Sequence, residues 1–442
     1  MTMKSLLLGA AAGFAALATA QAADLPMTKG EAVEYVKVCS AFGPGFFYIP
    51  GSDTCLKIGG EIRADYRFYN QSGDGVTGRN NFSGDRYKQN RNNHSSAFNT
   101  EARISFDART QTEFGLLRSF FQLRANSHPI PSNWSVGSDT SGNTFSIKYA
   151  YIQFGGLTAG YAHSFFGFYD LDYGNTIWGP YYAQSNVVNL LAYTADFGSG
   201  FTATLSVEDG RDHRQNAFQT IQGGQQVPDI VGQIRLKQDW GSIAVQAAAH
   251  QYRTAEPAVD AAGIPIAPGA VGYYPRSNKW GYAVGGSLLL NIPALDKGHF
   301  VIEGQYADGA LDYLGIGSTK LKGQDYFVTS NNRTIDGGKG WSVTAELGGN
   351  FTPQWGANLV GAYIDTTYDK FSNLGDRKVQ EYSLTGNLTY TVVKGLTVTG
   401  EVTYTHQQID NLAFVPAAGA PAIARDAKSD FWMGGVRIKR TF

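Results

Sequence analysis

Apolar and polar side chains alternate along the chain from residue 56 to its end, in segments of about ten residues. Successive side chains of a strand point to opposite faces, so each segment indicates a strand with one apolar and one polar face. In residues 200–208 the two faces carry Phe201, Ala203, Leu205 and Val207 against Thr202, Thr204, Ser206 and Glu208. The pattern predicts sixteen strands, at approximately 57–69, 97–109, 114–126, 144–154, 156–163, 188–197, 200–208, 230–239, 242–252, 279–290, 299–308, 341–351, 355–367, 379–390, 395–406 and 431–442.

The connections between these strands alternate between short and long. The short ones include Gly155, Gly198-Ser199 and Trp240-Gly241, whereas the long ones are 70–96, 164–187, 253–278, 309–340 and 407–430. Long loops at one rim, tight turns at the other and an even strand count are typical of an outer-membrane barrel. The fold class predicted is therefore all-β, a transmembrane antiparallel β-barrel of about sixteen strands.

A soluble two-sheet sandwich would show the same alternation, because it buries its apolar face and exposes its polar one. Two features favour the membrane. Gly and Ala recur on the apolar face, where a packed core would be left with voids. Aromatic side chains also gather near strand ends, as interfacial girdles require: Tyr66, Phe68, Tyr149, Tyr151, Trp280, Tyr282, Tyr382 and Tyr390. We expect lipid outside the barrel and water inside it.

Both termini carry export features. Residues 1–22 form an expected signal peptide, with Lys4 before an apolar stretch at 6–18 and a small-x-small cleavage site at Ala20-Gln21-Ala22. No later segment has the 18 or more apolar residues of a transmembrane helix. The final strand, 431–442, ends on Phe442 and resembles the insertion signal of outer-membrane barrels. These features predict a location in the bacterial outer membrane.

Composition adds a predicted disulfide and excludes one class of partner. The formal net charge of −1 gives no polybasic signature, which argues against nucleic acid. Cys39 and Cys55 are the two cysteines, and in an exported chain such a pair predicts a disulfide. The expected organisation is a disulfide-bonded segment at 23–55, which could plug the barrel or line its rim, followed by the barrel at 56–442.

Three stretches resemble the alphaproteobacterial porin family. They are Glu34–Cys39, Phe46–Gly51 and Thr54–Gly60 near the start, with further matches at Tyr161–Phe166 and in the terminal strand. The resemblance implies a sixteen-stranded general-diffusion porin that assembles as a homotrimer. It also implies that the third long loop, 164–187, folds into the barrel and narrows the pore.

Strand phase and height predict a pore constriction. Five cations fall on the polar phase near mid-strand of neighbouring strands: Arg63, Arg103, Arg118, Lys148 and Arg437. The 164–187 loop is rich in aromatic residues, and its only charges are Asp170 and Asp172. Set across the lumen, the two groups would create a transverse field that orients polar solutes. Alternatively, the arginines pair with Glu61, Glu101 and Glu401 and only solvate the lumen.

The motifs of enzymes are missing from the sequence. Its seven histidines have no partners at metal-ligand spacing, and there is no Gly-x-Ser-x-Gly elbow or phosphate-binding loop. We expect no enzyme, no cofactor and no metal site. The predicted function is passive diffusion of ions and small hydrophilic solutes through the outer membrane.

Two other functions remain open. A substrate-selective channel of the sugar type would use an aromatic slide, and the loop offers Tyr169, Tyr173, Trp178, Tyr181 and Tyr182. An adhesin or structural envelope protein would bind partners with the long loops 309–340 and 407–430, on a barrel that serves only as a base.

Overall fold

The computed structural model describes most of the chain beyond residue 36. The described ranges are 37–73, 94–127, 143–168, 175–214, 222–316, 324–372 and 375–442, with short gaps at 180, 185, 257–258, 260–261, 269, 271–272, 330–333 and 415–422. The expected signal peptide lies outside the described residues, and so do Tyr169, Asp170, Asp172 and Tyr173.

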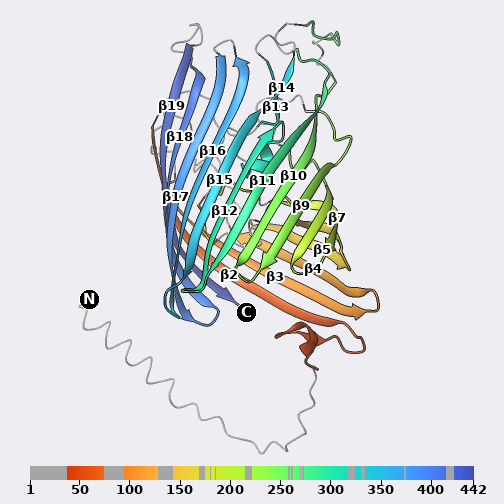
Figure 1. Ribbon diagram of the computed structural model, residues 1–442. Helices are drawn as coiled ribbons and strands as arrows, with labels where there is room; N and C mark the ends of the chain where they lie inside the picture. The colour runs from red at the N-terminus through yellow and green to blue at the C-terminus, as the bar shows by residue number, and fades with distance from the viewer. Residues whose placement is uncertain are drawn as a thin grey trace, which may run out of the picture.

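Within these ranges, sixteen antiparallel strands close into a barrel (Figure 1). Each strand pairs with its neighbours along the chain, and β19 pairs with β2 to close the ring. The strands are β2 (Cys55–Gly73), β3 (Ser96–Thr112), β4 (Gly115–Ser127), β5 (Asn143–Phe154), β6 (Leu157–His163), β7 (Val187–Asp196), β8 (Phe201–Glu208), β9 (Asp229–Gln238), β10 (Gly241–Arg253), β11 (Asn278–Ile292), β12 (Asp296–Asp308), β15 (Lys339–Asn350), β16 (Trp355–Ser372), β17 (Gly375–Val393), β18 (Leu396–Phe414) and β19 (Ile423–Thr441). The predicted fold class and strand number are confirmed.

One predicted loop is wrong. The range 407–430 was expected to be irregular, but β18 continues to Phe414 and β19 begins at Ile423, with Gln407 opposite Ser429. Beyond the apolar band a strand meets water on its outer side, so its outward side chains no longer need to be apolar. The strand then loses the alternation by which the sequence reveals it.

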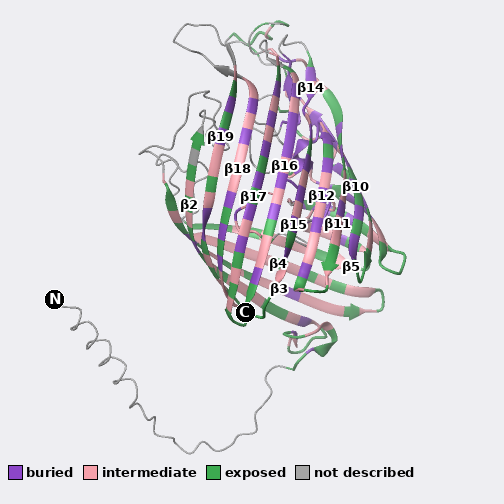
Figure 2. Ribbon diagram, turned by 60° about the vertical axis from the view of Figure 1, so that its left-hand side comes forward, coloured by how far each residue is buried: buried purple, intermediate pink, exposed green. Residues whose placement is uncertain are grey.

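The burial pattern is that of a barrel with an apolar outside. On β10 the outward Val245 is 56% exposed, whereas the inward Gln246 is 4% exposed. The same alternation of exposed and buried residues follows the other strands (Figure 2). A soluble sandwich would reverse it, because its polar face would be the exposed one. Within the described part of the chain, no helix is long and apolar enough to cross a membrane.

The Cys39–Cys55 disulfide is present, with the two Cα atoms 6.0 Å apart. It joins η1 (Ser40–Phe42) and the short β1 (Phe47–Tyr48) to the start of β2. This segment lies at the rim of short turns (Figure 1), where Phe46 packs 4.8 Å from the guanidinium of Arg109 on β3.

Two long connections fold into the lumen. They are the loop between β6 and β7, called here the 164–186 loop, and the 309–338 loop, which holds η3 (Leu311–Leu314), β13 (Tyr326–Val328) and β14 (Ile335–Gly337). Their apolar side chains meet in one buried cluster with the barrel wall: Phe166, Tyr182, Leu311, Tyr313, Leu314 and Phe327 from the loops, and Ile364 and Tyr368 from β16. The sequence predicted 309–340 only as a long connection; in the structure the 309–338 loop is part of the filling of the barrel.

The disulfide gives a stability prediction. Replacing both Cys39 and Cys55 with alanine should lower the free energy of unfolding by about 3 kcal/mol, because the cross-link restricts the unfolded chain. The midpoint of heat-induced unfolding in detergent, followed by gel mobility, measures the change. The wild-type protein treated with a reductant should show the same shift, and an unaltered midpoint in both would contradict the prediction.

Candidate functional site

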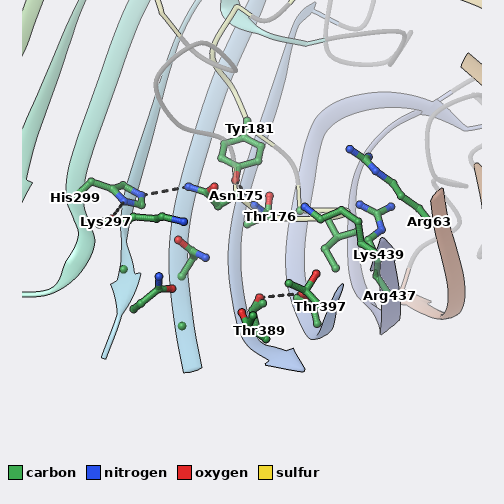
Figure 3. Close-up of a pocket in the computed structure, with 18 of the residues that line it drawn as sticks. Arg63, Asn175, Thr176, Tyr181, Lys297, His299, Thr389, Thr397, Arg437 and Lys439 are labelled. Carbon is green, nitrogen blue, oxygen red and sulfur yellow. Dashed lines mark hydrogen bonds between the residues drawn. The ribbon is translucent and has the colours of Figure 1, made fainter. Parts of the chain in front are cut away.

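A cavity of about 880 Å³ lies inside the barrel, between the 164–186 loop and the walls (Figure 3). Its described lining contains cationic, hydroxyl and amide side chains but no carboxylate. The cations on one side come from β2, β3, β5 and β19: Arg63, Arg103, Lys148, Arg437 and Lys439. Lys297 and His299 of β12 stand on another side, and the loop contributes Asn175, Thr176, Ile177, Gly179 and Tyr181.

A single buried carboxylate holds the tip of the loop. Glu401 of β18, 2% exposed, accepts hydrogen bonds from the backbone N–H groups of Ile177 and Trp178, both at 2.7 Å, and from that of Gly179 at 3.2 Å. Several N–H donors on one carboxylate replace the water that it loses on burial. The loop therefore lies where the wall presents this acceptor.

Other acidic side chains of the same wall bind the rest of the loop. Glu346 of β15 accepts from the amide of Asn175 at 2.7 Å and from the hydroxyl of Tyr181 at 3.3 Å. Glu303 of β12 accepts from the backbone N–H of Phe168 at 3.2 Å, and Glu381 of β17 accepts from the hydroxyl of Tyr182. The carboxylates of this half of the lumen are thus covered by the loop.

The 309–338 loop is held by a buried histidine between two carboxylates. His213, which follows β8, contacts Glu208 through Nε2 at 2.9 Å and Asp312 of η3 through Nδ1 at 3.1 Å. Its ring stacks on Tyr313 with the centroids 4.4 Å apart. Burial by itself lowers the pKa of His213, but hydrogen bonds to Asp312 and Glu208 outweigh it and raise the pKa well above its usual value.

On the basic wall the carboxylates bind the arginines that line the cavity. Arg437 donates to both oxygens of Asp65 at 2.6 and 2.7 Å. Arg103 donates to Glu101 at 2.6 Å, and Arg63 lies 2.5 Å from Glu61. Pairing with Glu61 and Glu101 had been considered from the sequence, whereas Glu401, the third candidate partner, binds the loop instead.

The structure brings together four of the five predicted cations. Arg63, Arg103, Lys148 and Arg437 line the cavity. Arg118 is not among its lining residues; it is the cross-strand neighbour of Arg109 and pairs with Asp107 at 2.9 Å. The predicted acidic partners, Asp170 and Asp172, lie outside the described residues, so the transverse field stays a prediction.

Sequence reasoning missed several residues of the site. Lys439 follows Arg437 by two positions and so shares its polar phase, a signal that was available. The polar phase of Glu303, Glu346 and Glu381 was equally visible. Their hydrogen bonds to a loop more than a hundred residues earlier could not be predicted, because no pattern in the neighbouring sequence indicates them.

Comparison with known proteins identifies the family. The model of the porin subfamily matches residues 24–435. Porin Omp2b of Brucella suis biovar 1 (strain 1330) is 30% identical over 452 residues, covering 100% of both chains, and Porin Omp2b of Brucella abortus (strain 2308) matches to the same extent. Among solved structures, the outer membrane channel DcaP of Acinetobacter baumannii has a TM-score of 0.58 at 14% identity, over 89% of this chain and 99% of that one.

The chain therefore belongs to the porin family, and it is a passive diffusion channel of the outer membrane. The resemblance to alphaproteobacterial porins, the channel function and the location are confirmed.

Release of the 164–186 loop should widen the channel. Glu401→Ala removes the acceptor of backbone N–H groups that are poorly placed to find water, so we expect the loop to leave its position and single-channel conductance to rise by about half or more. Thr405→Ala, on the same face of β18, is the control and should conduct like wild type. Equal conductance of all three proteins in planar bilayers would place the loop tip outside the conducting path.

Removal of the histidine between two carboxylates should loosen the 309–338 loop. His213→Leu leaves Glu208 and Asp312 buried without their cation, at a cost of about 3 kcal/mol. We expect faster cleavage in 309–338 by a protease added to detergent-solubilised protein. His406→Gln, at a more exposed histidine, should be cleaved at the wild-type rate; the same rate for His213→Leu would refute this role.

The direction of the pKa shift sets the pH dependence of that loop. Because the folded-state pKa of His213 is raised, its contribution to stability is complete below the unfolded pKa of about 6.5 and is lost as pH rises through the folded value. Protease sensitivity of the loop should therefore increase in alkaline solution and not between neutral and mildly acidic pH. The same cleavage assay as a function of pH measures it, with His213→Leu as the protein that should show no such rise.

Proposed function

We propose that this porin passes small hydrophilic solutes with a preference for anions, through the opening between the 164–186 loop and the basic wall. The observation that supports it is the sorting of charge inside the lumen. The loops cover the carboxylates of one wall, among them Glu303, Glu346 and Glu401, while the described lining of the cavity carries cations and no carboxylate.

The physical reason is the potential in a narrow aqueous space. Carboxylates that bind loop N–H groups or pair with arginines contribute less to the field in the passage than the cations that line it. Rings of Arg and Lys favour anions in pores, and a confined site raises the local concentration of ions of opposite charge. A solute anion therefore meets a lower barrier than a cation of the same size.

The roles of the predicted residues follow this proposal. Arg63, Arg103, Lys148 and Arg437, which line the cavity, would act directly on the solute. Arg118, which pairs with Asp107 outside that lining, would contribute less. Asp170 and Asp172 belong to the loop that faces these cations, so they would limit the preference for anions rather than create it.

The alternatives have less support. Of the aromatic residues considered for a sugar slide, Tyr181 lines the cavity, but Trp178 and Tyr182 are 8% and 2% exposed and packed into the wall. The 309–338 loop, considered for partner binding, is folded into the barrel. A catalytic role has no motif to support it.

The assembly is part of the proposal. The family resemblance implies a homotrimer, and the outward apolar side chains, such as Leu205 at 61% and Tyr193 at 61% exposure, suit contact with outer-membrane lipid or with a neighbouring subunit.

The ion preference is directly testable. In a bilayer with a KCl gradient, the reversal potential of the wild type should show chloride as the more permeant ion. Changing Arg63 and Arg103 together to glutamine should lower the chloride-to-potassium permeability ratio by about fivefold or more, since each charge near the path is worth roughly 1 kcal/mol in water.

Arg276→Gln is the control, because Arg276 is 72% exposed in a loop beyond the strands and pairs with Glu256. It should leave the ratio unchanged. A cation-selective wild type, or a double variant with the wild-type reversal potential, would overturn the proposed preference.

A further inference from the structure

Two cations stand directly opposite each other where the barrel closes. In the register between β19 and β2, Lys439 pairs with Arg63, and both side chains line the cavity. Like charges directly opposite on one face of a sheet destabilise it. In the same register the flanking pairs are Arg437 with Asp65 and Thr441 with Glu61, and on β3 Glu101 is opposite Arg63.

No carboxylate stands directly opposite Lys439, and Glu61, which lies diagonally across on β2, pairs with Arg63. On its other side Lys439 pairs with Thr397 of β18, and the residues two positions away along β19 are Arg437 and Thr441. Among the described residues the Lys439 ammonium makes no hydrogen bond or ion pair. Arg63 does have Glu61 at 2.5 Å and Glu101 at 3.6 Å, but its Nε is buried and has no hydrogen-bond partner among the described residues. The row therefore carries an excess of positive charge that faces the cavity.

Further donors surround this point. Arg437, held in place by both oxygens of Asp65, lines the cavity beside Lys439. On β18, Thr397 is opposite Lys439 and Thr399 is opposite Arg437, and both threonines line the cavity. Figure 3 shows Arg63, Arg437 and Lys439 reaching in from the wall, opposite Asn175, Thr176 and Tyr181 of the loop. The buried hydroxyl of Thr176 has no hydrogen-bond partner within the part of the chain that the structure describes.

We propose that Lys439, Arg63 and Arg437 form a binding site for a small dianionic solute that carries a phosphoryl group or two carboxylates. This inference rests on the proposed anion preference and adds a discrete, saturable site to it. Guanidinium groups match such oxyanions with paired N–H donors, and an ammonium adds a compact charge. A dianion between Lys439 and Arg63 removes the repulsion across the closing strands, which chloride can do only in part.

Such a site has to be weak. Conduction requires binding strong enough to attract the solute and weak enough to release it. The basic residues around the site are partly exposed, so water screens each contact. We therefore expect saturation at millimolar concentrations, as in a channel that concentrates its solute rather than a receptor that retains it.

The test is competition with chloride current. Phosphate in mildly alkaline solution and, separately, succinate are added to the wild-type channel in KCl, with ionic strength held constant. Each should reduce the current along a saturating curve, and the stronger of the two identifies a phosphoryl or a dicarboxylate preference. Glucose, which is neutral, should not produce a saturating reduction over the same millimolar range.

Variants separate the site from the general field. Lys439→Gln should raise the half-blocking concentration about tenfold, as expected for loss of one charge-assisted contact, and Lys439→Arg should stay within about threefold of wild type. Lys297→Gln removes the same charge from the opposite side of the cavity. It should reduce anion preference but leave the half-blocking concentration within about twofold of wild type.

Two results would overturn the site. One is a wild-type current that neither dianion reduces. If the reversal potential then still shows chloride as the more permeant ion, the proposed function stands and the site alone fails. The other is equal weakening of block by Lys439→Gln and Lys297→Gln, which would show a diffuse field instead of a site. A cation-selective wild type would remove the proposed function itself.

Discussion

A carboxylate that leaves water must be matched by hydrogen-bond donors, and this constraint decides how the lumen is filled. Glu401 meets it with three backbone N–H groups of the 164–186 loop, and Glu346 with the side chains of Asn175 and Tyr181. Once the loop covers these acids, their burial is tolerated only because the loop supplies the donors. The loop and this wall are therefore complementary parts of one structure.

That pairing also determines what a solute meets. The acids on the covered wall face the loop, and those of the open wall pair with Arg63, Arg103 and Arg437. A chain with a formal net charge of −1 thus presents a cationic surface to the passage. In the proposed function, selectivity follows from the placement of the charges and not from their sum.

The inward fold of the 309–338 loop follows the same rule. Tyr313 donates to Asp229 at 2.8 Å, and His213 lies between Glu208 and Asp312. These polar contacts match the loop to the polar inner wall of the barrel. Beside them, Leu311, Leu314 and Phe327 of the loop pack in an apolar cluster. The η3 helix of the loop packs near β12 and β15, whereas most of the cations that line the cavity come from β2, β3 and β19, so the proposed passage lies along the basic wall.

The sequence by itself determined the strands, their number and which side chains of each strand face the lumen, because alternation is a local property of an extended chain between lipid and water. It placed Arg63, Arg103, Lys148 and Arg437 inside. It failed at residues 407–430, where the outer face of the strand is no longer apolar. The tertiary structure alone decided which glutamates bind the loop and that Lys439 stands opposite Arg63, since these contacts depend on the register of β19 with β2 and on contacts between residues far apart in the chain.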